Sequence, residues 1–479
     1  MVIQAEPKKV FIETLGCQMN KSDSELMLGL LVKEGFEAVF KPDEADLLII
    51  NTCQIRGSAE DKAYSYMGRW NKLKKKRPEM KIAMAGCVAQ QTKEEVFKRA
   101  PYVDMVFGTQ NIQDLPRLLR ESFEGSTHLS AVDRQKPRST YDYFTDVSAQ
   151  RQSDVYAWVT IIEGCDYFCT YCVVPYTRGR QISRAPESIL REVNELAASG
   201  FKEVTLLGQT VDAYGKDFQD RSYGLASLLH ELNEVPGLER IRFMTSHPLD
   251  LTDDIIDAIA TLPKVMEYIH IPMQAGDDVV LDRMRRGYTA AQYYELVDKI
   301  HHRIPNVAVT GDYIVGFPGE TEEQFQHTLD SVVRSNIDVA NTAAYSPRKQ
   351  TPAGIWETER EEGVDDDIKQ ERLQRLNAAI TEQSARKNAP YLGQTVEVLV
   401  EGVSRRNNER LMGRTRSNKV VNFESSFSED DLVGKLISVR ITDAPAWSLT
   451  GVHTPENKMF QPLNSTEPTS CDLSLSSIS

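Results

Sequence analysis

Short apolar runs alternate with amphipathic segments along most of the chain, and this alternation predicts parallel sheets covered by helices. The first series lies in the N-terminal quarter of the chain. Its expected strands are residues 10–13, 46–50, 81–85 and 103–107. Its expected helices are residues 24–32, with Ser22 or Asp23 as N-cap, and then 58–74, 94–98 and 112–122. We therefore expect a parallel α/β domain over residues 8–124.

A second series has longer helices and predicts a domain over residues 151–383. The expected strands are residues 156–162, 203–207, 240–244, 267–271, 308–314 and 338–345. The expected helices are residues 186–198, 225–232, 253–260, 290–302 and 322–335. Six strand–helix units are too few to close an eightfold barrel. They fit an open, partial (β/α)6 barrel.

The C-terminal part of the chain changes to an all-β pattern. A long polar helix over residues 365–388 leads out of the barrel, and short alternating strands fill residues 394–452. About sixty residues of this kind predict a small β-barrel, which we place at residues 386–454. Residues 125–150 are polar without an apolar period and are expected to be a linker. Residues 455–479 are rich in Ser and Thr and are expected to be disordered.

Charge and hydropathy restrict the class of protein further. The 479 residues carry a formal net charge of −14, which argues against a protein that coats nucleic acid indiscriminately. No apolar run reaches the ~18 residues that span a membrane, and the first residues lack the apolar core of a secretory signal. We therefore expect a cytoplasmic protein with reduced cysteines and no membrane partner.

One segment departs from the acidic average. Residues 404–419 contain a single acid, Glu409, among six cations on the expected small barrel. A charge run is usually a solvated face. A run this one-sided in an acidic protein more often follows a phosphate backbone. The expected RNA-binding residues are Arg405, Arg406, Arg410, Arg414, Arg416 and Lys419.

Three cysteines lie close together in one short loop. Cys165, Cys169 and Cys172 have the spacing C-x3-C-x2-C. Three thiolates can ligate three irons of a cubane cluster and leave the fourth iron open for chemistry. A structural zinc site needs four ligands, but no histidine occurs between His128 and His230. A disulfide would leave one thiol over. An iron–sulfur cluster is therefore the favoured interpretation.

Three further cysteines follow the first three expected strands. Cys17, Cys53 and Cys87 each come after one strand, and the carboxyl ends of parallel strands converge on one crevice. Free cysteines are often simply buried, which explains one such residue better than three at equivalent positions. We therefore expect a second three-thiolate cluster. The seventh cysteine, Cys471, lies in the tail and is expected to be inert.

The cysteine loop resembles a known superfamily. C-x3-C-x-aromatic-C, with Tyr171 as the aromatic, is similar to the radical S-adenosylmethionine (SAM) enzymes. The resemblance implies that the open iron chelates SAM and that an electron then splits SAM to give a 5′-deoxyadenosyl radical. It also implies a partial-barrel core and an electron donor such as flavodoxin or ferredoxin.

Other segments resemble the methylthiotransferases within that superfamily. The segments are GCQMN at residues 16–20, NTCQIR at 51–56 and GCVAQQ at 86–91. The resemblance implies an auxiliary 4Fe-4S cluster on Cys17, Cys53 and Cys87. The 404–419 segment resembles the TRAM domain, an RNA-binding module. The motif forms, including CVVPYTRG, are most similar to the tRNA-2-methylthio-N6-dimethylallyladenosine synthase (MiaB-type) branch.

Barrel topology predicts which residues line the site, because functional side chains gather at the carboxyl ends of barrel strands. Gln209, Ser246, Gln274 and Asp312 occupy such positions and, with Tyr171, are expected to contact SAM or substrate. The segments LLGQTVDAY, SHP, PMQAG and DYIVGFPGET resemble family signatures. Thr210 and Asp212 depart from the usual form LLGQNVNAY. Arg178 and Arg180 follow the cluster. Solvated surface charges are the commoner fate of arginine, but beside an open cluster a guanidinium can pair with a phosphate or a carboxylate, and we favour this pairing.

Together these features predict a radical methylthiotransferase that converts the C2–H of N6-(dimethylallyl)adenosine, next to the anticodon of tRNA, into C–S–CH3. We expect two 4Fe-4S clusters, SAM, tRNA as partner and a monomeric enzyme. Two alternatives stay open. A sister enzyme would act on threonylcarbamoyl-adenosine in tRNA or on an aspartate of a ribosomal protein. A non-catalytic RNA-binding iron–sulfur sensor would need a cluster but no open iron beside a SAM-binding barrel.

Overall fold

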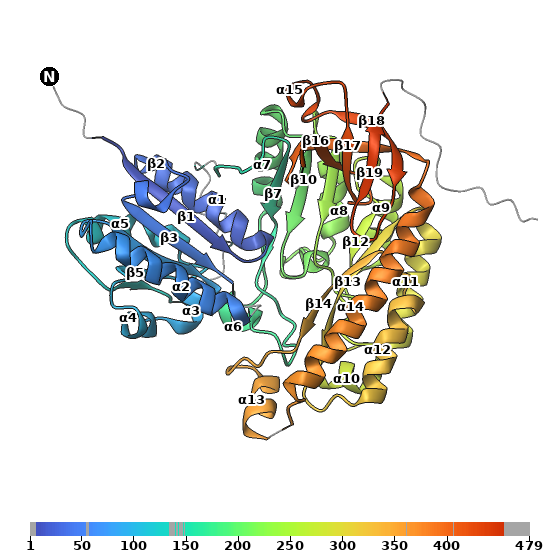
Figure 1. Ribbon diagram of the computed structural model, residues 1–479, viewed down its shortest axis with the longest axis horizontal. Helices are drawn as coiled ribbons and strands as arrows, with labels where there is room; N and C mark the ends of the chain where they lie inside the picture. Colours follow the sequence, from blue (N-terminus) through green and yellow to red (C-terminus); the bar gives the residue numbers. More distant parts are fainter. Residues whose placement is uncertain are drawn as a thin grey trace, which may run out of the picture.

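The computed structural model describes residues 6–53, 57–133, 139, 142, 147, 149–360, 362–405 and 407–454, with the backbone alone at 57–59. An N-terminal α/β lobe stands beside a larger barrel lobe, and a small β-barrel packs on the barrel lobe (Figure 1). The predicted architecture is therefore observed: a parallel α/β domain, an open six-stranded barrel and a small closed C-terminal β-barrel. No helix in these ranges is long and apolar enough to cross a membrane.

The N-terminal lobe is a six-stranded sheet in which every strand pair is parallel. The strand order is β2-β1-β3-β4-β5-β6, so the order reverses between β1 and β3. The strands are β1 (Lys8–Leu15), β2 (Phe36–Ala38), β3 (Leu47–Thr52), β4 (Lys81–Gly86), β5 (Met105–Phe107) and β6 (Leu129–Ala131). Such a reversal opens a crevice outside the carboxyl ends of the strands, where ligands bind in open α/β sheets.

Helices cover both faces of this sheet because alternate strand residues point to opposite sides. Leu47 and Ile49 pack against one pair of helices, whereas Leu48 and Ile50 pack against the others. The first pair is α1 (Gln18–Lys33) and α5 (Leu115–Phe123). The other face carries α2 (Gly57–Lys74), α3 (Cys87–Thr92) and α4 (Glu95–Arg99). Short 3-10 turns occur at Pro42–Glu44 and Ile112–Asp114.

Three sequence expectations for this lobe were wrong in detail. Helix α1 begins at Gln18, so neither Ser22 nor Asp23 is its N-cap. The polar residues of its first turns are buried, so the start of the helix shows no apolar periodicity in the sequence. The short edge strands β2 and β6 were not predicted, and β6 lies within the segment expected to be a linker.

The barrel lobe holds six parallel strands in chain order around an open barrel. β10 lies between β7 and β11, β13 lies between β12 and β14, and a parallel bridge between Ile241 and Val265 joins the two halves. The strands are β7 (Tyr156–Thr160), β10 (Glu203–Leu207), β11 (Arg240–Phe243), β12 (Tyr268–His270), β13 (Ala308–Val315) and β14 (Val339–Ala344). All six overlap predicted strands.

Helices surround these strands on the outside, and one long helix runs along the barrel lobe towards the small barrel (Figure 1). The outer helices are α7 (Pro186–Ala198), α8 (Leu225–Asn233), α9 (Asp253–Thr261), α10 (Asp278–Arg283), α11 (Ala290–Arg303), α12 (Glu322–Arg334) and α13 (Pro352–Glu359). The long helix is α14 (Asp366–Asn388), and a 3-10 turn (Ala389–Tyr391) follows it. A further 3-10 turn, Val211–Ala213, follows β10. Pro186 starts α7 at a position where no intrahelical N–H is needed.

The C-terminal unit is a closed five-stranded barrel in the order β15-β16-β17-β19-β18. Its interior is filled by apolar side chains such as Val398, Phe423 and Ile441. The strands are β15 (Thr395–Ser404), β16 (Asn407–Arg414), β17 (Val420–Glu424), β18 (Leu436–Asp443) and β19 (Leu449–His453), with helix α15 (Glu429–Leu432) between β17 and β18. The expected tail at 455–479, with Cys471, lies outside the described residues.

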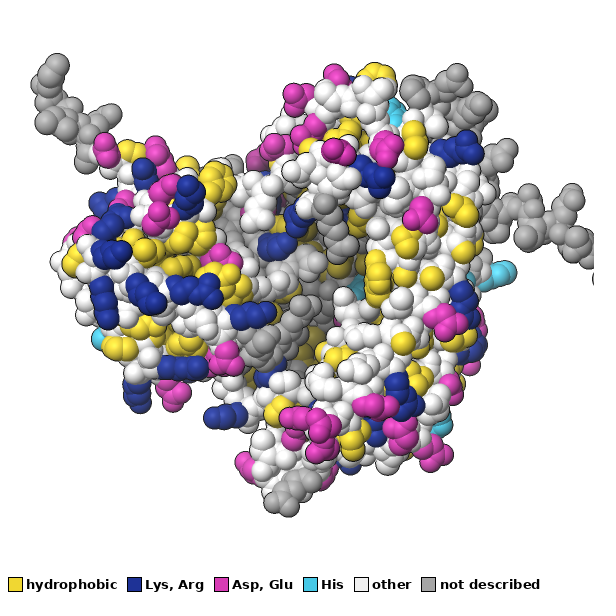
Figure 2. Space-filling model, in the orientation of Figure 1, with side chains coloured by type: hydrophobic (Ala, Val, Ile, Leu, Met, Phe, Trp, Pro, Cys, Tyr) yellow, Lys and Arg dark blue, Asp and Glu magenta, His cyan; other side chains and the backbone are white. Residues whose placement is uncertain are grey.

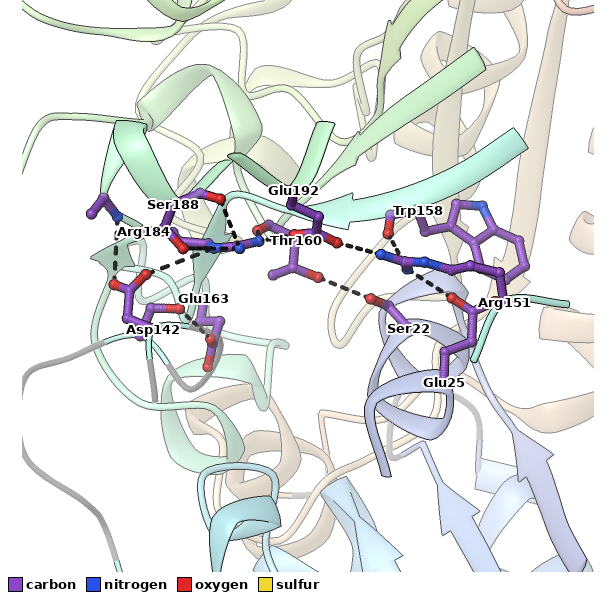
Figure 3. A network of polar contacts seen from close by, with 12 residues as sticks. Ser22, Glu25, Asp142, Arg151, Trp158, Thr160, Glu163, Arg184, Ser188 and Glu192 are labelled. Atoms are coloured by element: carbon purple, nitrogen blue, oxygen red, sulfur yellow. Dashed lines mark hydrogen bonds and ion pairs between the residues drawn. The ribbon is translucent and has the colours of Figure 1, made fainter. Parts of the chain in front are cut away.

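A chain of buried ion pairs joins the N-terminal lobe to the barrel lobe (Figure 3). Arg151 donates to Glu25 of α1 at 2.9 Å and also pairs with Glu192 of α7. Glu192 in turn pairs with Arg184, which lies 3.7 Å from Asp142. The two lobes are thus held in one arrangement by charges that are largely removed from water.

Candidate functional site

The cysteine loop is held at its two ends by a short antiparallel ribbon. Strands β8 (Ile162–Glu163) and β9 (Ile182–Ser183) pair with each other and enclose residues 164–181, which include the short helix α6 (Val174–Thr177). Within the loop, the Cys165 N–H donates to the carbonyl of Gly179 at 3.2 Å, and the Cys172 N–H donates to that of Cys169 at 3.0 Å. The backbone therefore fixes where the three thiols lie.

These thiols sit where a negative charge is costly without a compensating partner. Burial raises the pKa of Cys165, and it raises the pKa of Cys172 to about 12, with the charge of Cys169 adding to both shifts. The Thr210 hydroxyl lies 3.3 Å from the Cys165 sulfur. Thr210, which departs from the family's usual motif, therefore contacts the cysteine loop directly.

One buried guanidinium faces this loop and was missed by sequence reasoning. Arg286 donates to the Cys169 sulfur at 3.4 Å and to the Pro272 carbonyl at 3.2 Å, and its Nε lies 3.0 Å from the Tyr288 hydroxyl. Arg286 is 5% exposed. It lies more than a hundred residues after the cysteines, in no motif whose spacing indicated a role.

The residues expected to contact SAM all lie at the carboxyl ends of barrel strands or in the cysteine loop. Asp312 accepts hydrogen bonds from His270 at 3.2 Å and from Asn341 at 2.9 Å. Burial acts to raise its pKa, but these hydrogen bonds and the His270 charge hold it below its usual range. Gln274 has a positive φ of 76° and donates its N–H to the Asp312 carbonyl at 2.9 Å.

Ser246 lies at the end of β11, beside a stacked aromatic pair. Its hydroxyl is buried and makes no hydrogen bond within the described residues, and the same holds for His247 Nε2. The Tyr167 ring of the cysteine loop stacks on His247 with a centroid separation of 3.8 Å. Burial lowers the pKa of His247 to about 2, so this imidazole is neutral at physiological pH. Asp212 accepts the His247 N–H at 2.8 Å.

Tyr171 and Gln209 differ in their surroundings. Tyr171 is partly buried and packs against the barrel-lobe core, next to the charge of Arg286. Gln209 accepts the Gly164 N–H at 2.6 Å. It also lines a pocket with the N-terminal cysteines, and so lies between the two groups of thiols.

The second group of cysteines lies at the point where the N-terminal sheet reverses its order. Leu15 of β1 pairs with Thr52 of β3, and Thr52 pairs with Gly86 of β4. The three strands therefore end side by side, and Cys17, Cys53 and Cys87 follow directly. All three thiols line one pocket, as the sequence predicted from their positions.

Local backbone requirements explain the Gly–Cys pairs in this region. Gly86 has a positive φ of 90°, and a Cβ on it would come within 2.4 Å of the Asn51 side chain. The Cys17 thiol donates to Asn20 at 3.3 Å. The pKa of Cys17 is lowered to about 6, first by a hydrogen bond with Cys53 and, against the effect of burial, by the charge of Arg178.

The same pocket is completed by the barrel lobe. Val174, Arg178 and Gln209 line it opposite the three N-terminal cysteines and Asn20. Arg178 is 5% exposed and pairs with the Asp23 carboxylate of α1 at 2.6 Å. This matches the expected carboxylate pairing of Arg178, while Arg180 pairs with Asp166 at the surface.

The expected RNA-binding cations are distributed differently from the prediction. Arg416 pairs with Glu267 at 2.8 Å and donates to the carbonyls of Pro263 and Val265 in the barrel lobe. Lys419 pairs with Asp338 at 2.8 Å. Arg414 pairs with Glu401 at 3.0 Å, and its carbonyl accepts from Arg240 at 2.8 Å. These three residues thus have partners inside the protein, which corrects the expectation that the whole run faces RNA.

Two of the remaining cations have side chains at the protein surface. Arg405 is exposed, and Arg410 pairs with the exposed Glu424 at 2.9 Å, its one ion pair among the residues that the structure describes. Arg406 lies outside the described residues, as do Gln54, Ile55 and Arg56 of the NTCQIR segment. An exposed ion pair contributes little free energy, so Arg410 can exchange its partner for a phosphate.

Both cysteine groups suit an iron–sulfur cluster by their donor chemistry. Each provides three thiols, and each has a buried arginine beside it that favours negative charge. No group of three or more His, Cys, Asp and Glu side chains in the described part of the chain is arranged to hold a single metal ion. A coordinated cluster would offset the cost of burying thiolates.

Comparison with known families assigns each part of the chain. Residues 9–108 match the family described as "Uncharacterized protein family UPF0004", residues 159–332 match the radical SAM superfamily, and residues 390–453 match the TRAM domain. The protein is therefore a radical SAM enzyme with a TRAM domain. Membership of this superfamily implies SAM and a 4Fe-4S cluster.

Curated relatives identify the branch. The chain is 45% identical over 447 residues to the tRNA-2-methylthio-N(6)-dimethylallyladenosine synthase of Bacillus mycoides, covering 93% of this chain and 85% of that protein. It is 46% identical over 446 residues to the synthase of the same name from Anoxybacillus flavithermus, covering 93% and 82%. The chain belongs to this family of methylthiotransferases, as the sequence motifs predicted.

Solved structures support the fold alone. The radical SAM methyltransferase TsrM from Kitasatospora setae matches with a TM-score of 0.54 at 15% identity, covering 74% of this chain and 76% of that chain. At this identity the match supports the overall fold and nothing more specific.

Proposed function

We propose that this protein adds a methylthio group to carbon 2 of N6-(dimethylallyl)adenosine next to the anticodon of tRNA. One observation carries the proposal: Arg178 and Gln209 of the barrel lobe line the same pocket as the three N-terminal cysteines. A radical site and a sulfur site need to act on one carbon atom, and this interface brings their residues together. The names of the relatives agree with this reaction.

The residues divide into two groups. Cys165, Cys169 and Cys172 hold the SAM-chelating cluster, and Cys17, Cys53 and Cys87 hold an auxiliary 4Fe-4S cluster. When bound, the first cluster and SAM supply a radical for C–H activation, and the second holds the sulfur for transfer. Arg286 orients the Cys169 thiolate by donating to it.

The other partners follow from the same reaction. The small C-terminal barrel takes part in binding tRNA through the outward cations Arg405 and Arg410. An electron donor of the flavodoxin or ferredoxin type reduces the first cluster. We place the enzyme in the cytoplasm and propose that it acts as a monomer.

The test is mass spectrometry of tRNA nucleosides from a strain with and without this gene. Loss of 2-methylthio-isopentenyladenosine, with accumulation of its unthiolated precursor, is the expected result. A change in a threonylcarbamoyl derivative would assign the enzyme to the sister branch instead. If no tRNA nucleoside changes, a ribosomal-protein aspartate becomes the substrate to examine.

Cysteine variants separate catalysis from sensing. Cys165→Ala should abolish formation of 5′-deoxyadenosine, whereas Cys17→Ala should permit SAM cleavage and stop methylthiolation. Cys471→Ala in the tail is the matched control and should leave both activities unchanged. A wild-type protein that binds RNA and a cluster but never cleaves SAM would be a sensor.

A further inference from the structure

A row of cations lies on the outer side of helix α2 in the N-terminal lobe. From Lys62 to Pro78 the sequence has seven Lys and Arg residues and no Asp or Glu. Two of them have partners within the lobe, since Lys74 pairs with Asp104 and Arg77 with Asp46. The other five are exposed and form no ion pair within the described ranges: Lys62, Arg69, Lys72, Lys75 and Lys76.

Three of these five lie on one face of the helix. The intervals from Lys62 to Arg69 and from Arg69 to Lys72 are seven and three residues, which place the side chains on one helical face. Lys76 lies in the turn that follows the last helical residue, Lys74. At ~1.5 Å per residue, the row covers about 15 Å between Lys62 and Lys72 alone. The opposite face carries Met67 and Trp70, which are buried against the sheet.

The row is directed towards the catalytic interface. Helix α2 begins at Gly57, four residues after Cys53, whose thiol lines the shared pocket. Figure 2 shows dark-blue side chains in a line across the face of the N-terminal lobe, leading towards the hollow between this lobe and the barrel lobe. A ligand that reaches the pocket can therefore also lie along α2.

The charge of this surface stands out in an acidic protein. The chain carries a net charge of −14, so five exposed cations without an intervening acid form a local field that attracts a polyanion. In addition, Arg414, Arg416 and Lys419 have partners within the protein. The small barrel therefore presents fewer cations to RNA than its sequence suggests, and other cations are needed to neutralise the phosphates.

We propose that Lys62, Arg69, Lys72 and Lys76, here called the α2 row, bind the sugar–phosphate backbone of the RNA substrate. The proposal rests on the proposed function and extends its RNA surface to the N-terminal lobe. A protein partner fits less well, because the cores of protein–protein interfaces are depleted of lysine. Lysine and arginine side chains are common phosphate contacts and position RNA without reading its sequence.

The experiment measures binding of a prenylated anticodon stem–loop RNA to the reconstituted full-length enzyme by fluorescence anisotropy over a range of salt. The variant carries Lys62→Gln, Arg69→Gln, Lys72→Gln and Lys76→Gln. Its control carries the same number of changes at exposed cations on other elements: Lys33→Gln, Lys41→Gln, Arg191→Gln and Lys299→Gln. SAM cleavage without RNA and cluster absorbance show that both proteins are intact.

We expect the α2-row variant to bind roughly 100-fold more weakly at ~0.1 M salt, with the slope of log K against log salt reduced by about 3. The control variant should keep nearly the wild-type affinity for RNA and nearly the wild-type salt slope. Equal binding of variant and control, with wild-type turnover intact, would overturn the α2-row proposal and leave the proposed function standing.

Two other outcomes also decide the matter. Normal RNA binding with turnover lost under reduced flavodoxin, but kept under dithionite, would assign the row to an acidic electron-donor protein and overturn the RNA assignment. A wild-type enzyme that neither binds nor modifies the prenylated RNA would overturn the proposed function, and the α2-row proposal with it.

Discussion

Two buried arginines carry positive charge from the barrel lobe to the two groups of cysteines. Arg178 influences Cys17 and Cys87 across the lobe interface, and Arg286 donates to Cys169. A guanidinium stays protonated even when buried, so its charge is a permanent part of each site. Hydrogen bonds to cluster sulfurs and nearby charge set the reduction potential of iron–sulfur centres. These arginines are therefore positioning residues whose replacement should alter redox behaviour.

Arg286→Gln should lower turnover by roughly 10- to 100-fold, a common effect of removing a group that orients a metal ligand. Loss of the charge disfavours the more negative reduced cluster, so its midpoint potential should become more negative. Redox titration followed by electron paramagnetic resonance measures this shift, and Arg286→Lys should restore part of it. A variant with full iron content and an unchanged potential would show that Arg286 has only a packing role.

Glu320, at the end of the GFPGE turn, gives the stability a pH dependence. Burial raises its pKa to about 7, against the opposing effects of the Gly316 N–H and of Arg372. The folded protein therefore binds a proton more tightly than the unfolded chain does. This contribution is complete below pH ~4.5 and is lost as the pH rises through about 7.

Glu320→Gln tests this directly, because glutamine cannot ionise. Relative to the variant, the wild-type apoprotein should lose about 3 kcal/mol of stability between pH 4.5 and pH 8. Denaturant titrations at both pH values measure the difference between the two proteins. A constant difference over this range would mean that Arg372, 2.9 Å away, keeps Glu320 ionised throughout.

At the level of helices and strands, the sequence predicted the bounds of those elements whose limits are set by buried apolar residues or by a proline. The five-residue strand Glu203–Leu207 and the helix Pro186–Ala198 match in both bounds, because one is a continuous buried run and the other begins at a proline. Helix α1 was placed too late because its first turns bury polar residues. Asp23 and Glu25 pair with Arg178 and Arg151, and Asn20 donates to the side chain of Asn51 in β3. Polar burial of this kind depends on partners distant in sequence, which no local pattern reports.

The partners of α1 form the element that joins the lobes, and Arg151 is central to it. Arg151→Met removes the charge that pairs with Glu25 and Glu192, both of which are largely buried. Leaving buried carboxylates unpaired should cost about 3–5 kcal/mol. We expect faster hydrogen exchange in α1 and a loss of methylthiolation, with SAM cleavage less affected.

An arginine in an exposed ion pair on the N-terminal lobe serves as the control for the buried Arg151. Arg117 forms an exposed pair with Glu121 at 3.0 Å, so Arg117→Met should cost less than about 0.5 kcal/mol and leave exchange in α1 unchanged. Equal effects of the two substitutions would show that the ion pairs in Figure 3 do not hold the lobes together.

At the scale of the whole molecule, the three units share two interfaces with different chemistry. The lobe interface forms one pocket, in which Arg178 and Gln209 of the barrel lobe face the three N-terminal cysteines. The sequence had predicted sites only within each domain. The second interface attaches the small barrel through Arg416, Lys419 and Arg240 to acids and carbonyls of the other unit. Glu267 and Asp338 lie 149 and 81 residues from their partners, so no local pattern could show these pairs.

Arg416 therefore distinguishes attachment from RNA binding. Charge-assisted hydrogen bonds contribute about 1.5–3 kcal/mol each, so Arg416→Ala should loosen the small barrel and speed hydrogen exchange in β12 and β16. The salt dependence of RNA binding should stay unchanged if Arg416 serves attachment alone. Arg405→Gln with Arg410→Gln should instead reduce the salt slope by about 1–2 and leave exchange as in the wild type. A reduced slope for Arg416→Ala with normal exchange would show that its pairing with Glu267 gives way to a phosphate when RNA binds.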